Sequence, residues 1–344
     1  MIMNENLYSL LIEEEFISHE YDISVDFLSE AKNLKRLELN TKKFKYLDSM
    51  INLEELSLGC YNGDLSFLSK MKNLRVLDVP CHNISRDELE GNLHLEVLKV
   101  NKCEHLEFLK ELPYLESFSA DVNSSDIPKN LRLKHLSITE LDSYLELPFL
   151  EELNLTSYEK ESYFSNLLSL EKLSIWHGDE KLMIPPNVKD LMIIGFRGKF
   201  PIFNQLESLI IDGNNMDISN LENMINLKKL DIIGFVPRLC LKKLTNLKYF
   251  RIFNMEKGEC KIELPSYIEE VNLCGMNKDL SLLKGLKNLK KLSIEFYVSN
   301  TEILSELTSL EELDIRSECC EYKFLDNLKN LKVFKLGNDD KPQN

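Results

Sequence analysis

One short apolar spacing recurs sixteen times along this 344-residue chain and constrains its fold more than any other feature. Apolar residues stand at positions 1, 4 and 6 of a six-residue segment, as in LKRLEL (34–39), LEELSL (53–58) and LKKLSI (289–294). We call each segment a hexamer and number positions from its first residue. The other thirteen hexamers begin at residues 74, 95, 115, 133, 150, 170, 188, 206, 227, 247, 268, 310 and 331.

Each hexamer predicts one short β-strand. Positions 4 and 6 share one face of a strand, whereas position 5 points the other way and is polar in most copies. One such strand buries its apolar face only against its neighbours, so successive copies are expected to stack in parallel and in register. A coiled coil needs apolar residues in a strict heptad phase, and steps of 17, 18, 20 and 21 residues between hexamers destroy that phase.

This pattern resembles the leucine-rich repeat family over about residues 32–336. FLSKMKNL (67–74) and LLKGLKNL (282–289) are similar to the repeats of internalins, whereas IPKNL (127–131) and IPPNV (184–188) resemble the short repeats of bacterial effector proteins. The resemblance implies an α/β solenoid, a right-handed horseshoe with one long parallel sheet on its concave face. Short 3-10 or extended segments, the latter in copies with proline, are expected on the convex face.

The repeat pattern also divides the chain. Residues 1–31 are expected to form an N-terminal cap region with an extra strand within LYSLLI (7–12), residues 32–336 an array of about sixteen repeats, and residues 337–344 a flexible tail. No C-terminal cap is recognisable after the last hexamer. The edge of its strand could therefore pair with another chain, so self-association through this repeat is predicted.

In-register stacking makes equal positions of neighbouring repeats into cross-strand neighbours. Charges alternate in sign at position 2 over the last five repeats: Lys248, Glu269, Lys290, Glu311 and Lys332. Neighbouring strands are therefore expected to pair these side chains. At position 9 the family usually has Asn, Cys or Thr, but this chain often has an aromatic residue there: Tyr61, Phe196, Phe235 and Tyr297. Water, altered turns or apolar filling is therefore expected to replace much of the usual polar ladder.

Charge and hydropathy restrict the class of partner and the location. The net charge is -15 and the sequence pI about 5.0, so the average surface repels a phosphate backbone and no nucleic-acid partner is predicted. The N-terminus lacks the basic region of a signal peptide, and no apolar run could span a bilayer. We therefore expect a cytoplasmic protein without a membrane partner, with export without a cleaved leader left open.

The candidate partner-binding surface lies on the concave face, which positions 5 and 7 form and which this family often uses to bind partners. Between the eighth and twelfth repeats these positions change from polar to large apolar residues. We call the following set the concave patch: Trp176, Met192, Ile194, Ile210, Ile233 and Phe253, with Tyr249 at position 3. A contiguous exposed apolar patch indicates binding of a protein partner. The alternative is that these side chains pack on one another or beneath a loop, while Phe196, Phe235 and Met255 at position 9 fill the core.

A cysteine cluster provides a second hypothesis. Cys60, Cys81 and Cys103 follow three successive strands with His82 and His105 nearby, so a metal or redox module is an alternative function. No CxxC or HxxxH spacing supports it. Reduced structural thiols are the simpler interpretation, and neither a metal nor a cofactor is predicted.

Catalytic motifs are missing from the sequence, which has no phosphate-binding glycine loop, no GxSxG and no HExxH. No enzymatic activity is therefore predicted. The expected function is a non-enzymatic protein-interaction scaffold or regulatory subunit. The alternative is a secreted bacterial-type effector whose repeats target a host protein.

Overall fold

The structure is a computed structural model of the whole chain. It describes residues 8–13, 33–40, 47–59, 61, 63–103, 105–213, 216–254, 261–275, 280–295, 301–316 and 322–337. The chain forms two compact units, Met1–Leu170 and Glu171–Asn344. Among the described residues, no helix combines the length and apolar character needed to cross a membrane.

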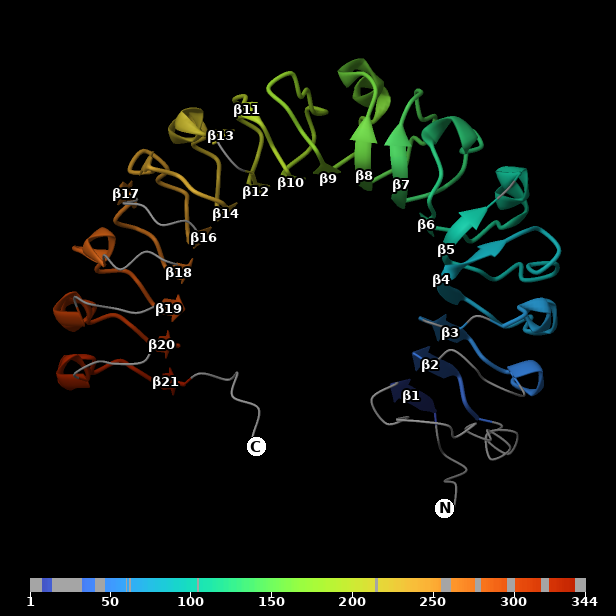
Figure 1. Ribbon diagram of the computed structural model, residues 1–344, viewed down its shortest axis with the longest axis horizontal. Helices are drawn as coiled ribbons and strands as arrows, with labels where there is room; N and C mark the ends of the chain where they lie inside the picture. The colour runs from blue at the N-terminus through green and yellow to red at the C-terminus, as the bar shows by residue number, and fades with distance from the viewer. Residues whose placement is uncertain are drawn as a thin grey trace, which may run out of the picture. The chain divides into compact units, whose positions relative to one another are not determined.

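The first unit is a parallel sheet in which each strand pairs with the next one along the chain. Figure 1 shows its strands on the inner side of the curve that this unit makes. The strands are β1 (Ser9–Glu13), β2 (Arg36–Asn40), β3 (Glu55–Leu58), β4 (Val76–Ile84), β5 (Val97–Cys103), β6 (Ser117–Ser119), β7 (His135–Leu141) and β8 (Glu152–Tyr158).

The second unit repeats this arrangement, again with parallel pairing between successive strands of the sheet. Its strands are β9 (Lys172–Trp176), β10 (Asp190–Ile194), β12 (Ser208–Asp212), β14 (Lys229–Ile233), β16 (Tyr249–Asn254), β18 (Glu270–Gly275), β19 (Lys291–Glu295), β20 (Glu312–Ile315) and β21 (Val333–Leu336). Two small parallel pairs lie outside this sheet. They are β11 (Gly198–Lys199) with β13 (Met216–Asp217), and β15 (Arg238–Cys240) with β17 (Lys261–Glu263).

The core consists of the apolar positions of the hexamers stacked in register. Position 4 forms a continuous row in which Leu37 lies opposite Leu56, and Leu56 opposite Leu77, all at most 1% exposed. Each of these side chains buries its surface against the repeats on both sides, at about 1.5–3 kcal/mol per residue. The predicted strands and their in-register stacking are confirmed, because the period-2 pattern leaves only this face for burial.

Short 3-10 helices connect many of the strands on the side opposite the sheet (Figure 1). They are η3 (Leu47–Ser49), η4 (Ser66–Lys70), η5 (Leu106–Glu111), η6 (Ser124–Asp126), η7 (Glu161–Asn166), η8 (Ser219–Asn223), η9 (Ser281–Leu283), η10 (Thr301–Glu306) and η11 (Tyr322–Asn327). Three of the five connections with a Leu-Pro or Ile-Pro pair contain no 3-10 helix within their described residues, in line with the expected extended course, whereas η5 and η6 lie in the other two.

A polar ladder runs along the edge of the second unit at the residue just before each hexamer, which we call the edge position. Asn226 Nδ2 donates to the Asn204 carbonyl at 2.8 Å, and Asn246 Nδ2 to the Ile225 carbonyl at 2.9 Å. Asn288, Ser309 and Asn330 make the equivalent bond to the preceding repeat. This ladder ties successive turns together by satisfying their carbonyls. It was not predicted from the sequence, which directed attention to position 9.

Position 9 is filled mainly by apolar side chains where aromatic residues stand, as expected. Phe196 is fully buried and meets the ring of Phe200 edge-on, with 5.3 Å between centroids. Tyr61 is 7% exposed and Phe235 is half-buried. Met255 and Tyr297 lie outside the described residues. Aromatic packing thus replaces polar bonds at this position in both units.

The predicted charge alternation is confirmed in the second unit. Glu269 forms ion pairs with Lys248 on one side and Lys290 on the other, each at 2.8 Å. The hydrogen bonds from these two lysines lower the pKa of Glu269 to about 2. Lys332 pairs with Glu311 at 2.6 Å. These side chains are largely solvated, so the pairs neutralise the surface and contribute little to stability.

The first and last described strands, β1 and β21, lie near the predicted ends of the repeat array. β1 pairs with β2 in parallel, which confirms the extra strand expected near residues 7–12. Most of the predicted cap region and residues 338–344 of the predicted tail lie outside the described residues. In β21, Phe334 and Leu336 occupy core positions yet are 37% and 50% exposed.

Candidate partner-binding surface

The concave patch lies on five neighbouring strands of the second unit, β9, β10, β12, β14 and β16. Along each strand the residues at positions 4 and 6 are buried, so those at positions 3, 5 and 7 point out of the sheet. Every residue of the predicted patch therefore faces outward. The exposed fractions of these side chains differ, because neighbouring side chains cover one another to different extents.

The first part of the patch surrounds Trp176. This side chain is 53% exposed and lies opposite Ile194 on the neighbouring strand. Met192 lies opposite Ile210, and these two and Ile194 are half-buried. The four side chains form an apolar cluster on β9, β10 and β12, with an indole as its most exposed member.

The second part of the patch lies on β14 and β16. Ile233 is opposite Phe253, and both are half-buried. Tyr249, also half-buried, accepts a hydrogen bond from Asn272 Nδ2 to its hydroxyl oxygen at 3.2 Å. Burial raises the pKa of the Tyr249 phenol. The ring is thereby held as a neutral, oriented side chain at the rim of the patch.

Two charged residues that were not included in the predicted patch lie on the same two strands as its second part. Asp231 lies at position 5, with Ile210 opposite it on one side and Arg251 on the other. An Asp231 carboxylate oxygen is 3.8 Å from Arg251 Nη1, while its Oδ1 atom is buried without a hydrogen-bond partner. Burial raises the pKa of Asp231. The predicted patch is therefore two apolar clusters, the second of which shares its strands with a partly buried ion pair.

This pair could have been found from the sequence by reading position 5 as a row across strands rather than selecting its apolar members. That row reads Ser174, Met192, Ile210, Asp231 and Arg251. What the row could not show is the burial of the carboxylate, which depends on the size of its neighbours.

The cysteine cluster does not assemble in the described residues. The register between β4 and β5 shifts between Val79 and Asn83, and Cys103 lies opposite Ile84 rather than Cys81. Cys81 is exposed and its thiol donates to the Gly59 carbonyl at 2.8 Å. Cys103 is buried, which raises its thiol pKa to about 12. Such a thiol stays protonated and suits a structural role better than redox sensing.

The other residues of the predicted cluster are Cys60, His82 and His105. Cys60 lies outside the described residues. His82 Nε2 is 2.6 Å from the Tyr61 carbonyl, and His105 precedes η5 with a left-handed backbone. Within the ranges that the structure describes, no group of three or more His, Cys, Asp or Glu side chains is arranged to hold a metal ion.

The geometry of the repeats identifies the fold. Each described repeat places leucine or a similar residue inward from a short parallel strand and returns through a 3-10 or extended segment. The chain has the leucine-rich repeat fold.

Comparison with known proteins gives distant similarities. No family model matches the chain. A late blight resistance protein homolog of Solanum demissum, R1B-13, is 23% identical over 254 residues, which is 71% of this chain. The chain spans only 18% of the length of that curated relative.

Among solved structures, an internalin from Listeria monocytogenes is similar, with 18% identity, coverage of 97% of this chain and 83% of that chain, and a TM-score of 0.30. A leucine-rich repeat protein of Leptospira interrogans has 15% identity, coverage of 96% of both chains and a TM-score of 0.45. A third structure, TLR13 in complex with ssRNA13, has 19% identity, coverage of 91% of this chain and 52% of that chain, and a TM-score of 0.42.

Proposed function

We propose that this leucine-rich repeat chain is a non-enzymatic scaffold or regulatory subunit that binds a protein partner through the concave patch. The observation that supports this most is Trp176, an indole 53% exposed at the margin of a cluster with Ile194, Met192 and Ile210. Covering the exposed half of an indole removes roughly 100 Å² of surface, worth about 2.5 kcal/mol. An exposed aromatic anchor of this kind is typical of protein interfaces.

The ion pair beside the second apolar cluster adds a polar requirement for the partner. The Arg251 side chain is 43% exposed and can pair with an acidic side chain, whereas the buried Asp231 Oδ1 is out of a partner's reach. A partner that places an acidic group beside its apolar contacts fits this surface better than a purely apolar one. Such complementarity gives specificity.

The test is affinity purification with the double variant Ile194→Asp, Phe253→Asp from the organism's own extract. Each substitution places a carboxylate in one of the two clusters, and loss of the specific partners is expected because desolvating that charge opposes binding. The matched control is Ile202→Asp, Ile225→Asp, which changes two exposed isoleucines of the same unit that lie off the patch. Circular dichroism shows whether both variants keep the strand content. Identical partner sets for the wild type and the patch variant would refute the assignment.

The two alternative functions, a secreted effector and a metal or redox module, stay predictions from the sequence. The described residues carry no feature specific to an exported effector, and Cys103 argues against a redox module. A cytoplasmic location and the absence of enzymatic activity are likewise part of this proposal, and cell fractionation measures the first. One similar structure is a complex with an RNA, so the prediction against nucleic acid also requires a direct test.

A further inference from the structure

At the edge position, four successive repeats of the first unit depart from the rule that most repeats of the second unit follow, whereas Ser169 of the first unit keeps it by donating to the Pro148 carbonyl at 2.8 Å. Where Asn or Ser ties most turns of the second unit together, four successive repeats of the first unit carry His94, Tyr114, Arg132 and Phe149. Phenylalanine has no hydrogen-bond donor, so the ladder bond is lost at Phe149. Tyr114 and Phe149 are instead 58% and 52% exposed. At these positions the ladder hydrogen bond to the preceding repeat is replaced by exposed side chains that do not fill the core. This indicates that the side chains have a role at the surface.

The four side chains form one row. The rings of His94 and Tyr114 stack with 6.0 Å between centroids and 22° between planes. The Arg132 guanidinium lies 5.9 Å from the centroid of the Phe149 ring. These contacts orient the side chains along the edge of the sheet and leave their outer faces in water.

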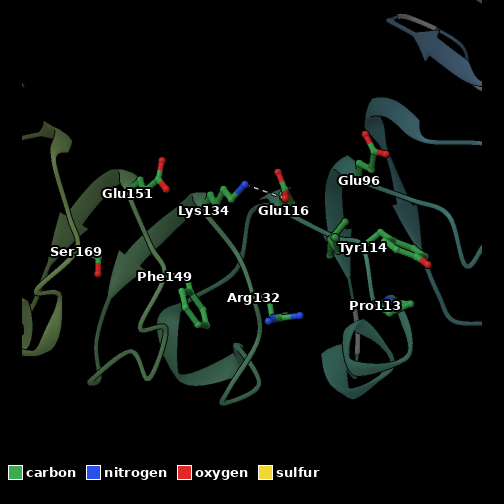
Figure 2. Close-up of a pocket in the computed structure, with 10 residues that line it drawn as sticks. Glu96, Pro113, Tyr114, Glu116, Arg132, Lys134, Phe149, Glu151 and Ser169 are labelled. Atoms are coloured by element: carbon green, nitrogen blue, oxygen red, sulfur yellow. Dashed lines mark hydrogen bonds and ion pairs between the residues drawn. The ribbon is translucent and has the colours of Figure 1, made fainter.

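Three side chains of this row, Tyr114, Arg132 and Phe149, form one wall of a groove of about 600 Å³. Figure 2 shows Tyr114, Arg132 and Phe149 along one side and the charged position-2 residues along the other, Glu96, Glu116, Lys134 and Glu151. A further hollow of about 390 Å³, which shares Tyr114 and Glu96, lies along the same edge. The surface is thus long and narrow, as an extended chain requires.

The spacing of the rings indicates which extended chain fits. Tyr114 and Phe149 belong to repeats that lie two strands apart, a separation of about 9.6 Å at about 4.8 Å per strand. One turn of a polyproline II helix has three residues and advances about 9.3 Å. Residues i and i+3 of such a helix therefore face the two rings together. Its carbonyls make no internal bonds, so the Arg132 guanidinium between the rings can donate to them.

The charged wall favours a basic ligand. Lys134 is bound to Glu116 at 2.8 Å, and Arg75 binds Glu96 through two bonds of 2.9 Å. The Glu151 carboxylate makes no ion pair within the described part of the chain, so it remains available to a cation. Two of the three glutamates of the groove are thus neutralised by a neighbouring cation, and a phosphate backbone would be repelled by Glu151 and by the net charge of -15.

We propose that this groove binds a proline-rich peptide in the polyproline II conformation, with prolines on Tyr114 and Phe149 and a cationic side chain toward Glu151. Single-stranded RNA, whose bases could stack on the same rings, is the competing ligand. This site is independent of the concave patch and lies in the other unit.

The test measures fluorescence anisotropy with a labelled nine-residue peptide of three Pro-Pro-Arg repeats, whose arginines share one face of a polyproline II helix. The comparison ligands are the same peptide with glutamate for arginine and a ten-residue oligouridylate. The Pro-Pro-Arg peptide is expected to bind at least tenfold more tightly than either. Glu151→Lys is expected to weaken its binding about fivefold.

Two substitutions separate binding from folding. Tyr114→Asn and Phe149→Asn restore the edge residue that the second unit uses, so each is expected to keep the thermal midpoint while weakening peptide binding at least tenfold. The matched control is Tyr267→Asn, which removes a tyrosine 58% exposed at the same position of the second unit and is expected to leave binding unchanged. The concave-patch double variant should also bind the peptide normally.

The proposal is overturned if the Pro-Pro-Arg peptide does not bind, or if Tyr267→Asn weakens binding as much as Tyr114→Asn. Oligouridylate binding more tightly than the peptide would instead identify the groove as a nucleic-acid site. Unchanged peptide affinity in both asparagine variants would exclude the rings as its contacts.

Discussion

At the scale of single residues, Asp231 is the most unusual side chain of the candidate surface. It is ionisable, its side chain is only 14% exposed, and one carboxylate oxygen lacks a hydrogen bond. Burial raises its pKa above the ordinary value of 3.8 in spite of the nearby Arg251. A buried polar group left unsatisfied costs stability, and such costs are common where a surface is shaped for binding.

We predict that Asp231→Asn stabilises the isolated chain by about 1 kcal/mol at pH 7. The folded chain holds the proton of Asp231 more tightly than the unfolded chain, so ionisation of this group destabilises the folded state as pH rises above 3.8. The stabilisation by Asp231→Asn should thus be largest at neutral pH and shrink as pH falls toward 3.8. Urea unfolding of both proteins at several pH values measures this difference in the free energy of unfolding. Asp314→Asn, in the same row but 3.4 Å from Arg316, is the control and should bring no gain. A loss of stability in Asp231→Asn would mean that the pair with Arg251 dominates.

At the scale of the element, the repeat combines an apolar row, a charged row and an edge row. The first two were predictable, because positions 4 and 6 must be inward and because neighbouring strands pair equal positions. The edge row was not, because the Asn or Ser just before the hexamer occurs in a loop, where its side chain could equally face water. Only the stacked turns show that Asn246 reaches the Ile225 carbonyl of the preceding repeat.

We predict that Asn246→Ala lowers the free energy of unfolding by about 1 kcal/mol, the usual net value of one such hydrogen bond. Chemical denaturation measures the change. Asn223→Ala, at an exposed asparagine at the end of η8, is the matched control and should have little effect. If both substitutions lowered the free energy of unfolding equally, the hydrogen bond from Asn246 to the Ile225 carbonyl would contribute nothing measurable to stability.

At the scale of the whole molecule, a repeat array depends on neighbours to cover each apolar face. β21 pairs with β20, and within the described residues no further strand covers its other edge. Phe334 and Leu336 occupy positions that are buried in the preceding repeats, yet they are exposed here. Exposed apolar side chains beside a strand edge that no described strand covers favour pairing with another chain.

We predict that the chain associates with itself at high concentration through β21. Sedimentation velocity over a range of concentrations should show a larger species for the wild type and only monomer for Phe334→Lys, Leu336→Lys. The control is Ile202→Lys, Ile225→Lys, which adds the same charge to exposed apolar positions away from β21 and should associate as the wild type does. A wild type that remains monomeric at every concentration would contradict this prediction.

The sequence by itself determined the repeat, the strands, the inward leucines and the sign of neighbouring charges, because each follows from a local period that successive copies share. It also indicated which outward positions of the second unit are apolar. Only the tertiary structure decided how deeply Asp231 is buried, that the shift in β4 separates Cys81 from Cys103, and that the edge residues form a ladder in the second unit and one wall of a groove over part of the first. These features depend on the sizes of side chains in adjacent turns and on the exact register between them, and a periodic pattern does not contain either quantity.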